Sequence, residues 1–237
     1  MVASLTSSTL LLVHSPLVGP STWKPLADLA RRRGIDVSCP DLTGVADADS
    51  PQWQHLVDIA VSSATDDSDI VVVGHSGAGA VLPVIGEQIG NRPKALVFVD
   101  ALVPPTGGEH RTPQPFLQFL DDRLLETKVV DGRLPKWLDW WPAETVNQLV
   151  ESPSDLAELR ADMPQLLRSF YDEPVPMPSN WMGQPSAYLK LSAAYDHEYG
   201  EVGDLGCPRA SIDGTHLSIF TAPSDVLDAI EQLVSSV

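Results

Sequence analysis

One serine lies where its side chain could act as a nucleophile. Ser76 is the central residue of GHSGA, residues 74–78, between the β-branched run Ile70–Gly74 and the helical pattern Ala78–Ile89. A sharp strand-to-helix turn needs small residues on both sides of the serine and presents its hydroxyl at the carboxyl edge of a sheet. The pattern favours attack on an electrophilic carbon. An ordinary glycine-rich turn without chemistry is the alternative.

A base that could activate this serine lies near the carboxyl end of the chain. His216, in DGTHL at residues 213–217, follows the last expected strand, Arg209–Ile212, and precedes the last expected helix. An imidazole in such a loop can take the proton of a serine hydroxyl. His75 is adjacent to Ser76 in sequence, but its side chain should point elsewhere.

The third member of a triad would be a carboxylate that orients the imidazole. Asp196 is the first choice because it ends the strand-like run Tyr188–Tyr195, one strand before the histidine loop. The order Ser76, Asp196, His216 is also the chain order of triads built on this kind of turn. Asp100 is the alternative, because it ends the strand that follows the helix behind Ser76.

Strand-like and helical segments alternate in both outer parts of the chain. This favours an α/β fold with a mostly parallel central sheet flanked by helices. The expected strands are Thr9–His14, Ile35–Cys39, Ile70–Gly74, Ala95–Asp100, Tyr188–Ala193 and Arg209–Ile212. The expected helices are Ser21–Arg33, Pro51–Ala64, Ala78–Ile89 and Ser224–Val234, with Pro142–Glu151, Ser154–Asp162 and Pro164–Tyr171 in a proline-rich middle part. We therefore predict a core of residues 1–104 and 186–237, interrupted by a helical cap insertion at residues 105–185.

Several short motifs occur in an order that is fairly specific for one fold. They are LVHSP at 12–16 with Trp23 behind it, DL at 41–42, GHSGA at 74–78, VFVDA at 97–101 and GTHL at 214–217. With these motifs the chain resembles the α/β-hydrolase superfamily over nearly its whole length. It is most similar to small serine esterases of the plant methylesterase and hydroxynitrile lyase type and to their bacterial relatives. The resemblance implies a serine hydrolase of the α/β-hydrolase fold that acts on an ester, thioester or lactone.

One departure from that family concerns the donors to an oxyanion. Relatives use two backbone N–H groups, and the corresponding residues here are Pro16 and Gly77. Proline has no backbone N–H, and losing one such donor slows acyl transfer by about 10²–10³-fold. The N–H of Leu17 or the hydroxyl of Ser15 could replace it. Alternatively, the histidine and serine perform acid–base chemistry as in a lyase, cyclase or isomerase.

Aromatic side chains gather in the predicted insertion. They are Phe116, Phe119, Trp137, Trp140, Trp141 and Trp181. Above the strand ends they would form an apolar pocket for a largely hydrophobic small molecule. Trp137 and Trp141 are candidate substrate contacts, although packing of the cap on the core is the alternative for any single tryptophan.

Composition limits the partners that the chain can have. A net charge of −17, from 32 acidic and 15 basic residues, repels nucleic acid and anionic lipid. No apolar run approaches the ~20 residues that span a bilayer, and LLLV at 10–13 lacks the flanks of a signal peptide. A cytoplasmic location is therefore the default expectation. We also expect no metal or cofactor, because HExxH, GxGxxG and CxxC patterns are absent. The oligomeric state, a homodimer included, stays open, and a binding module without chemistry is the remaining alternative.

Overall fold

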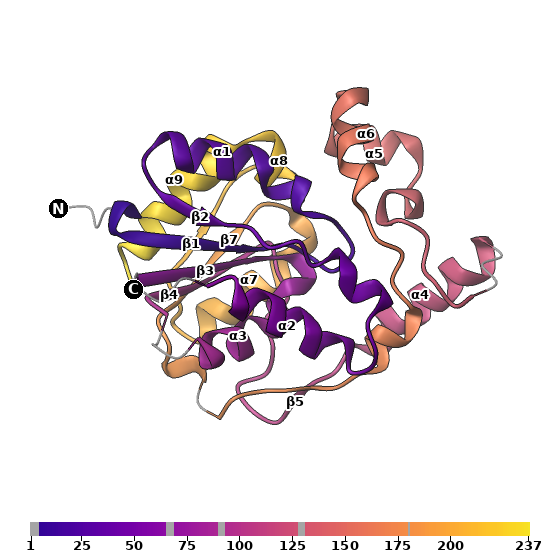
Figure 1. The fold of residues 1–237 in the computed structure, drawn as a ribbon, viewed down its shortest axis with the longest axis horizontal. Helices are drawn as coiled ribbons and strands as arrows, with labels where there is room; N and C mark the ends of the chain where they lie inside the picture. The colour runs from indigo at the N-terminus through magenta and orange to yellow at the C-terminus, as the bar shows by residue number, and fades with distance from the viewer. Residues whose placement is uncertain (1–4, 65–68, 90–92, 128–130, 180) are drawn as a thin grey trace.

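Six strands form one central sheet, and every neighbouring pair is parallel. The strands are β1 (Ser8–Val13), β2 (Asp36–Ser38), β3 (Asp69–His75), β4 (Ala95–Val99), β7 (Ser186–Lys190) and β8 (Arg209–Ser211), in the order β2-β1-β3-β4-β7-β8 (Figure 1). The computed structural model describes residues 5–64, 69–89, 93–127, 131–179 and 181–237. The parallel α/β class predicted from the alternation of elements is confirmed.

Alternate side chains of the strands enter two separate cores, one on each face of the sheet. Leu10 and Leu12 of β1 lie in the core beneath α1 (Lys24–Arg32) and α9 (Pro223–Val234), with the short α8 (Ser218–Thr221) nearby. Leu11 and Val13 lie in the opposite core, beneath α2 (Gln52–Ser62), α3 (Leu82–Gln88) and α7 (Asp196–Asp204) (Figure 1). Full burial of each such side chain contributes about 1.5–3 kcal/mol. The interior strands are therefore held rigidly from both sides.

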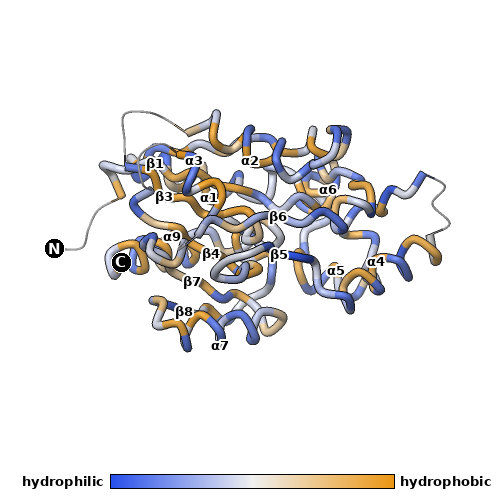
Figure 2. Tube along the Cα trace, turned by 90° about the horizontal axis from the view of Figure 1, so that it is seen from below, coloured by the Kyte–Doolittle hydropathy of each residue, from blue (hydrophilic) through white to orange (hydrophobic). Residues whose placement is uncertain are grey.

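The chain between β4 and β7 forms a group of helices beyond the sheet. It contains β5 (Glu109–His110), α4 (Gln114–Thr127), α5 (Ala143–Leu149), α6 (Pro153–Ala161) and β6 (Val175–Pro176), and β5 pairs with β6 in antiparallel fashion. Figure 1 places α4, α5 and α6 beyond the carboxyl ends of the strands, and Figure 2 shows them together at the end of the molecule opposite both termini. Ser21 N–H and Oγ–H donate hydrogen bonds of 2.8 Å to the Asp162 carboxylate. These bonds fix α6 to the core.

Some expected elements differ from those in the structure. The expected helix Pro164–Tyr171 is wrong, because only a 3-10 turn forms there, over Arg168–Asp172. The helix α4 was not expected, although Phe116, Leu120 and Leu124 recur in its sequence at intervals of four residues. The segment after Ser76 begins as a 3-10 helix, and α3 starts only at Leu82, with Pro83 in its first turn, where a missing N–H is tolerated. None of the described helices is long and apolar enough to cross a membrane.

Candidate active site

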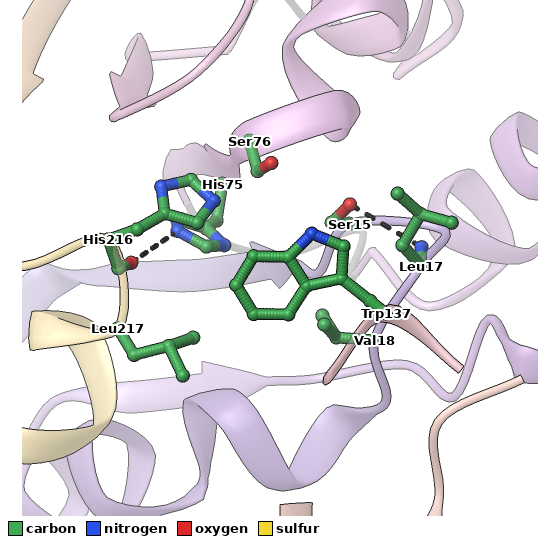
Figure 3. A pocket seen from close by; sticks show the side chains of 8 residues that line it. All are labelled: Ser15, Leu17, Val18, His75, Ser76, Trp137, His216 and Leu217. Carbon is green, nitrogen blue, oxygen red and sulfur yellow. Dashed lines mark hydrogen bonds between the residues drawn. The ribbon is translucent and has the colours of Figure 1, made fainter. Parts of the chain in front are cut away.

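The sheet reverses its strand order between β1 and β3. From β1 the chain moves outward to β2, whereas β3 returns to the other side of β1 and leads on to β4. The loops that leave the carboxyl ends of β1 and β3 therefore diverge, which is where open parallel sheets bind ligands. A pocket with about 220 Å³ of empty space, open solvent included, lies here. It is lined by Ser15, Leu17, Val18, His75, Ser76, Trp137, His216 and Leu217 (Figure 3).

Ser76 lies in a strained turn that only small neighbours permit. Its φ of 57° is in the left-handed region, which a residue with a side chain rarely adopts. A Cβ on Gly74 would lie 1.9 Å from Leu82 Cδ1, and a Cβ on Gly79 would lie 2.0 Å from the carbonyl oxygen of Leu102. The close approach of the backbone at Leu102 therefore requires glycine at position 79, whereas a side chain at position 74 would force the Leu82 side chain to move.

His216 lines the pocket, and one of its ring nitrogens is hydrogen-bonded to a carboxylate. Its Nδ1 donates a hydrogen bond of 2.7 Å to Asp100 Oδ2. Because an ionised carboxylate can only accept, Nδ1 carries the proton of the neutral ring, and Nε2 is left as the acceptor. His216 therefore has the tautomer that a general base for a serine hydroxyl needs.

Asp100 is buried and held by several donors at once. Its side chain has no exposed surface. Oδ1 accepts hydrogen bonds from the N–H groups of Leu191 at 2.8 Å and Ser192 at 3.0 Å, and Oδ2 accepts one from Ser192 Oγ at 2.6 Å. Burial by itself would raise the pKa of Asp100, but the hydrogen bond and charge of His216, with these donors, outweigh it and lower the pKa. The carboxylate facing His216 is therefore kept ionised.

The strand register explains why Asp100 lies near Ser76. His75 pairs with Val99 in the β3–β4 ladder, so Ser76 and Asp100 are the next residues of two neighbouring strands. Both residues have a positive φ, 57° for Ser76 and 44° for Asp100. Strain of this kind gathers at functional sites, where the surrounding structure must maintain it.

The prediction that Asp196 orients His216 is wrong. Strand β7 ends at Lys190, and the chain then turns outward, so that Asp196 becomes the first residue of α7 on the surface. The Asp196 side chain is 62% exposed and forms an ion pair with Lys190. The alternative carboxylate, Asp100, is the one that contacts His216.

His75 supports the histidine loop. Its Nε2–H donates a hydrogen bond of 2.9 Å to the carbonyl oxygen of His216, and the two rings lie 4.4 Å apart (Figure 3). Burial first, and then the charge of His216, lowers the pKa of His75 to about 3. A neutral His75 thus fixes the backbone that carries His216.

The region around Pro16 contains a hydroxyl directed at the turn. The N–H of Leu17 donates a long hydrogen bond of 3.4 Å to Ser15 Oγ (Figure 3). A Cβ built on Gly77 would lie 3.3 Å from Ser15 Oγ and 3.3 Å from Pro16 Cδ. Ser15 Oγ is therefore against the residue that follows Ser76, with Leu17 N–H behind it. His14, which accepts a hydrogen bond from Leu42 N–H and donates one to the Ser15 carbonyl, shapes this loop.

Tyr195 is a site residue that sequence reasoning missed. Its hydroxyl lies 3.2 Å from Ser76 Oγ, within hydrogen-bonding distance, and its ring stacks on His216 with centroids 5.2 Å apart and planes 10° apart. The only signal in the sequence was its position beside Asp196, in the loop that the prediction directed to the site.

The two candidate tryptophans occupy different places. Trp137 lines the pocket, with its ring centroid 5.7 Å from that of His216. Trp141 lies behind it, 6.2 Å from Trp137 and 5.9 Å from Phe119, and is not among the pocket-lining residues. Trp137 can therefore touch a ligand, whereas Trp141 positions Trp137. Over the described residues, no cluster of three or more His, Cys, Asp or Glu side chains could hold a metal ion.

The fold and these motifs define a known class of protein. The model of the alpha/beta hydrolase family matches residues 10–229, and the chain belongs to this family. Over 103 residues the chain is 29% identical to a carbendazim hydrolyzing esterase from Nocardioides sp. (strain SG-4G). That alignment covers 40% of this chain and 43% of the esterase, so the chain spans less than half of this curated relative.

Solved structures share the fold over nearly the whole chain. An extracellular alpha/beta-hydrolase from a Paenibacillus species, described as a structural and functional homologue of tobacco salicylic acid binding protein 2, has a TM-score of 0.72 at 19% identity. The superposition covers 94% of this chain and 97% of that one. Polyneuridine aldehyde esterase has a TM-score of 0.69 at 16% identity, covering 94% and 96%. The α/β-hydrolase fold predicted from the sequence is thus confirmed.

Proposed function

We propose that this chain is a serine hydrolase that cleaves an ester, thioester or lactone of a largely hydrophobic small molecule. Ser76 is the nucleophile, His216 the general base and Asp100 the carboxylate that orients it. The observation that carries the proposal is the 2.7 Å bond between His216 and buried Asp100, beside a serine in a strained turn. The esterases among the relatives support the same reaction class.

The proposed reaction proceeds in two halves. Ser76 Oγ attacks the carbonyl carbon while its proton moves to His216 Nε2, and the imidazolium then gives that proton to the departing alcohol or thiol. Water next attacks the acyl carbon, loses a proton to His216, and the bond to Oγ breaks as Ser76 recovers a proton. Asp100 stabilises the imidazolium that forms in both halves. The proposed steps need no cofactor.

The oxyanion is held by one backbone group and one side chain in this proposal. The N–H of Gly77 lies in the first turn after the nucleophile, where helical N–H groups have no internal partner. The second donor is the hydroxyl of Ser15. Because Leu17 N–H donates to Ser15 Oγ, that oxygen accepts from behind, and its own O–H is free to point at the pocket. A side-chain donor thereby replaces the N–H that Pro16 lacks.

Residues 105–185 serve as a cap that shapes the acyl or alcohol site. Trp137 from this segment lies against the ring of His216 in the pocket wall, and Leu17, Val18 and Leu217 add apolar walls. A small apolar pocket of this kind selects a compact hydrophobic group and excludes water from the reacting bond.

A covalent adduct tests the proposal most directly. The protein is mixed with p-nitrophenyl acetate and p-nitrophenyl octanoate, p-nitrophenol release is followed, and quenched samples are weighed by intact mass spectrometry. Carbendazim belongs in the same panel. We expect turnover and an acyl group on Ser76, both abolished in Ser76→Ala. If no ester were turned over and no adduct formed on Ser76, acyl transfer would be ruled out.

A second candidate is acid–base chemistry without an acyl-enzyme, as in a lyase, cyclase or isomerase. The observation that favours it is the contact between the hydroxyls of Ser76 and Tyr195 beside His216, which could hold a substrate oxygen instead of attacking it. In that case Ser76→Ala keeps partial activity while His216→Ala loses most of it. Near-complete loss in both variants favours the hydrolase.

A further inference from the structure

A phenol touches the nucleophile from an element that neither the family motifs nor the predicted triad includes. Tyr195 ends the 3-10 turn Ala193–Tyr195 between β7 and α7. Its hydroxyl is 3.2 Å from Ser76 Oγ, while its ring lies nearly parallel to the imidazole of His216, with a 10° angle between the planes. One side chain therefore contacts both groups that exchange the proton.

Tyr195 is placed as a hydrogen-bond donor rather than as a base. Burial raises the pKa of its phenol well above the ordinary value; the hydrogen bond to Ser76 lowers it in part, and the charges of Asp100 and Glu198 raise it further. The phenol therefore keeps its proton at any pH where His216 can act. An O–H that donates to Ser76 Oγ occupies one lone pair of that oxygen, so the proton of the serine must point elsewhere.

We propose that Tyr195 is a catalytic residue that donates a hydrogen bond to Ser76 Oγ throughout the reaction. In the resting state this bond turns the serine proton toward His216. When the bond between Oγ and the acyl carbon forms or breaks, the phenol stabilises the negative charge on Oγ and keeps its own proton. The proton itself still passes between Ser76 and His216. This inference rests on the proposed hydrolase function.

The distance between the two hydroxyls agrees with a bond that strengthens during the reaction. At 3.2 Å it is longer than the usual O–H···O separation of about 2.7–2.8 Å. Hydrogen bonds to a charged oxygen are shorter, about 2.5–2.7 Å, and roughly twice as strong. Only interactions that are stronger in the transition state than in the ground state accelerate a reaction. Tyr195 can meet that condition by a small movement toward Ser76.

The test compares Tyr195→Phe with Tyr199→Phe in the full chain. The first variant removes the hydroxyl but keeps the ring that stacks on His216. The second is a matched control, because the Tyr199 ring packs against Arg209 and Lys190, away from Ser76. A fluorophosphonate probe reports attack by Oγ directly, since Ser76 forms a bond to phosphorus as fluoride leaves. Steady-state hydrolysis of a p-nitrophenyl ester gives kcat and KM, and urea unfolding reports stability.

For Tyr195→Phe we expect the labelling rate and kcat to fall about 10- to 100-fold, with KM and the urea midpoint nearly unchanged. Tyr199→Phe should retain wild-type rates. Wild-type rates in Tyr195→Phe, or equal losses in the two variants, would overturn the role of Tyr195 and leave the hydrolase function standing. A wild-type protein that is neither labelled nor active on esters would overturn both.

Discussion

Asp100 Oδ2 accepts a 2.7 Å hydrogen bond from His216 Nδ1, although the two residues are 116 positions apart in the chain. Asp100 continues the strand next to the one that leads to Ser76, so the carboxylate and the serine leave adjacent strands of the same sheet. The loop after β7 contributes Leu191 and Ser192 as donors to the carboxylate, in place of an acid of its own.

Replacing the two aspartates separately distinguishes their roles. Asp100→Asn removes the negative charge that stabilises the imidazolium. The amide NH2 can also donate to Nδ1, which favours the tautomer with the proton on Nε2, where it cannot accept the serine proton. We expect kcat for ester hydrolysis to fall about 10³- to 10⁴-fold. Asp196→Asn disrupts only an exposed ion pair with Lys190 and should stay within about twofold of wild type. An equal loss of kcat in the two variants would show that Asp196 also contributes to catalysis.

The Ser15 hydroxyl can be tested by removing it and then supplying a backbone donor. Ser15→Ala should lower kcat about 10²-fold, as expected when one oxyanion donor is lost, while Ser15→Thr retains the hydroxyl and most of the activity. Adding Pro16→Gly to Ser15→Ala restores a backbone N–H and should recover part of kcat. An unchanged kcat in Ser15→Ala would indicate that Leu17 N–H, freed from Ser15, takes over.

Trp137 should govern which substrates fit. Trp137→Ala removes an apolar wall opposite His216, and we expect KM for p-nitrophenyl octanoate to rise more than KM for p-nitrophenyl acetate. Loss of a partly buried aromatic contact corresponds to about 10-fold. Trp141→Phe preserves the packing behind Trp137 and is the control. The same change in KM for both esters would contradict a role in selectivity.

Acidification should destabilise the fold through His75. The ordinary pKa of this residue is 6.5, and in the folded protein it is about 3. Between these values the unfolded chain binds more protons than the folded one, so the free energy of unfolding decreases as the pH falls, by at most about 1.4 kcal/mol per pH unit from this group. Burial lowers the pKa of His14 and acts in the same direction.

Urea unfolding from pH 7 to pH 4 measures this dependence. His75→Gln keeps a donor for the His216 carbonyl but does not titrate, and it should flatten the loss of stability. His55→Gln, at an exposed position, should leave it unchanged. If the free energy of unfolding decreased equally with falling pH in wild type and His75→Gln, His75 would not be the source of the pH dependence.

The order of motifs in the sequence was sufficient to predict the parallel sheet and to place Ser76 and His216 at its carboxyl edge. The motifs did not decide which of two carboxylates orients His216, because Asp100 and Asp196 both lie at the ends of expected strands. Which carboxylate reaches His216 depends on where β7 ends. The strand stops at Lys190, five residues before the end of the strand-like run Tyr188–Tyr195, and Asp196 therefore starts a surface helix. Strand-end positions depend on tertiary packing, which a local pattern does not record.

Tyr195 and the middle part of the chain illustrate the same limit. The residue types around Tyr195 reveal no chemistry, and its contact with Ser76 arises only because the 3-10 turn Ala193–Tyr195 places the phenol against Ser76 and His216. The helix α4 was missed although Phe116, Leu120 and Leu124 follow the helical period, whereas Pro164–Tyr171 has aromatic residues that pack in a 3-10 turn instead of the expected helix. In Pro164–Tyr171, packing on neighbouring elements overrides local preference.

The anchoring of Ser76 and Asp100 on adjacent inner strands has a consequence for heat inactivation. The two residues share the rigidity of β3 and β4, whereas His216 follows β8, an edge strand of three residues. On warming, the short edge should loosen before the centre of the sheet does. If the proposed triad is right, activity should therefore be lost reversibly at temperatures below the melting transition, with Ser76 and Asp100 still in place and His216 displaced.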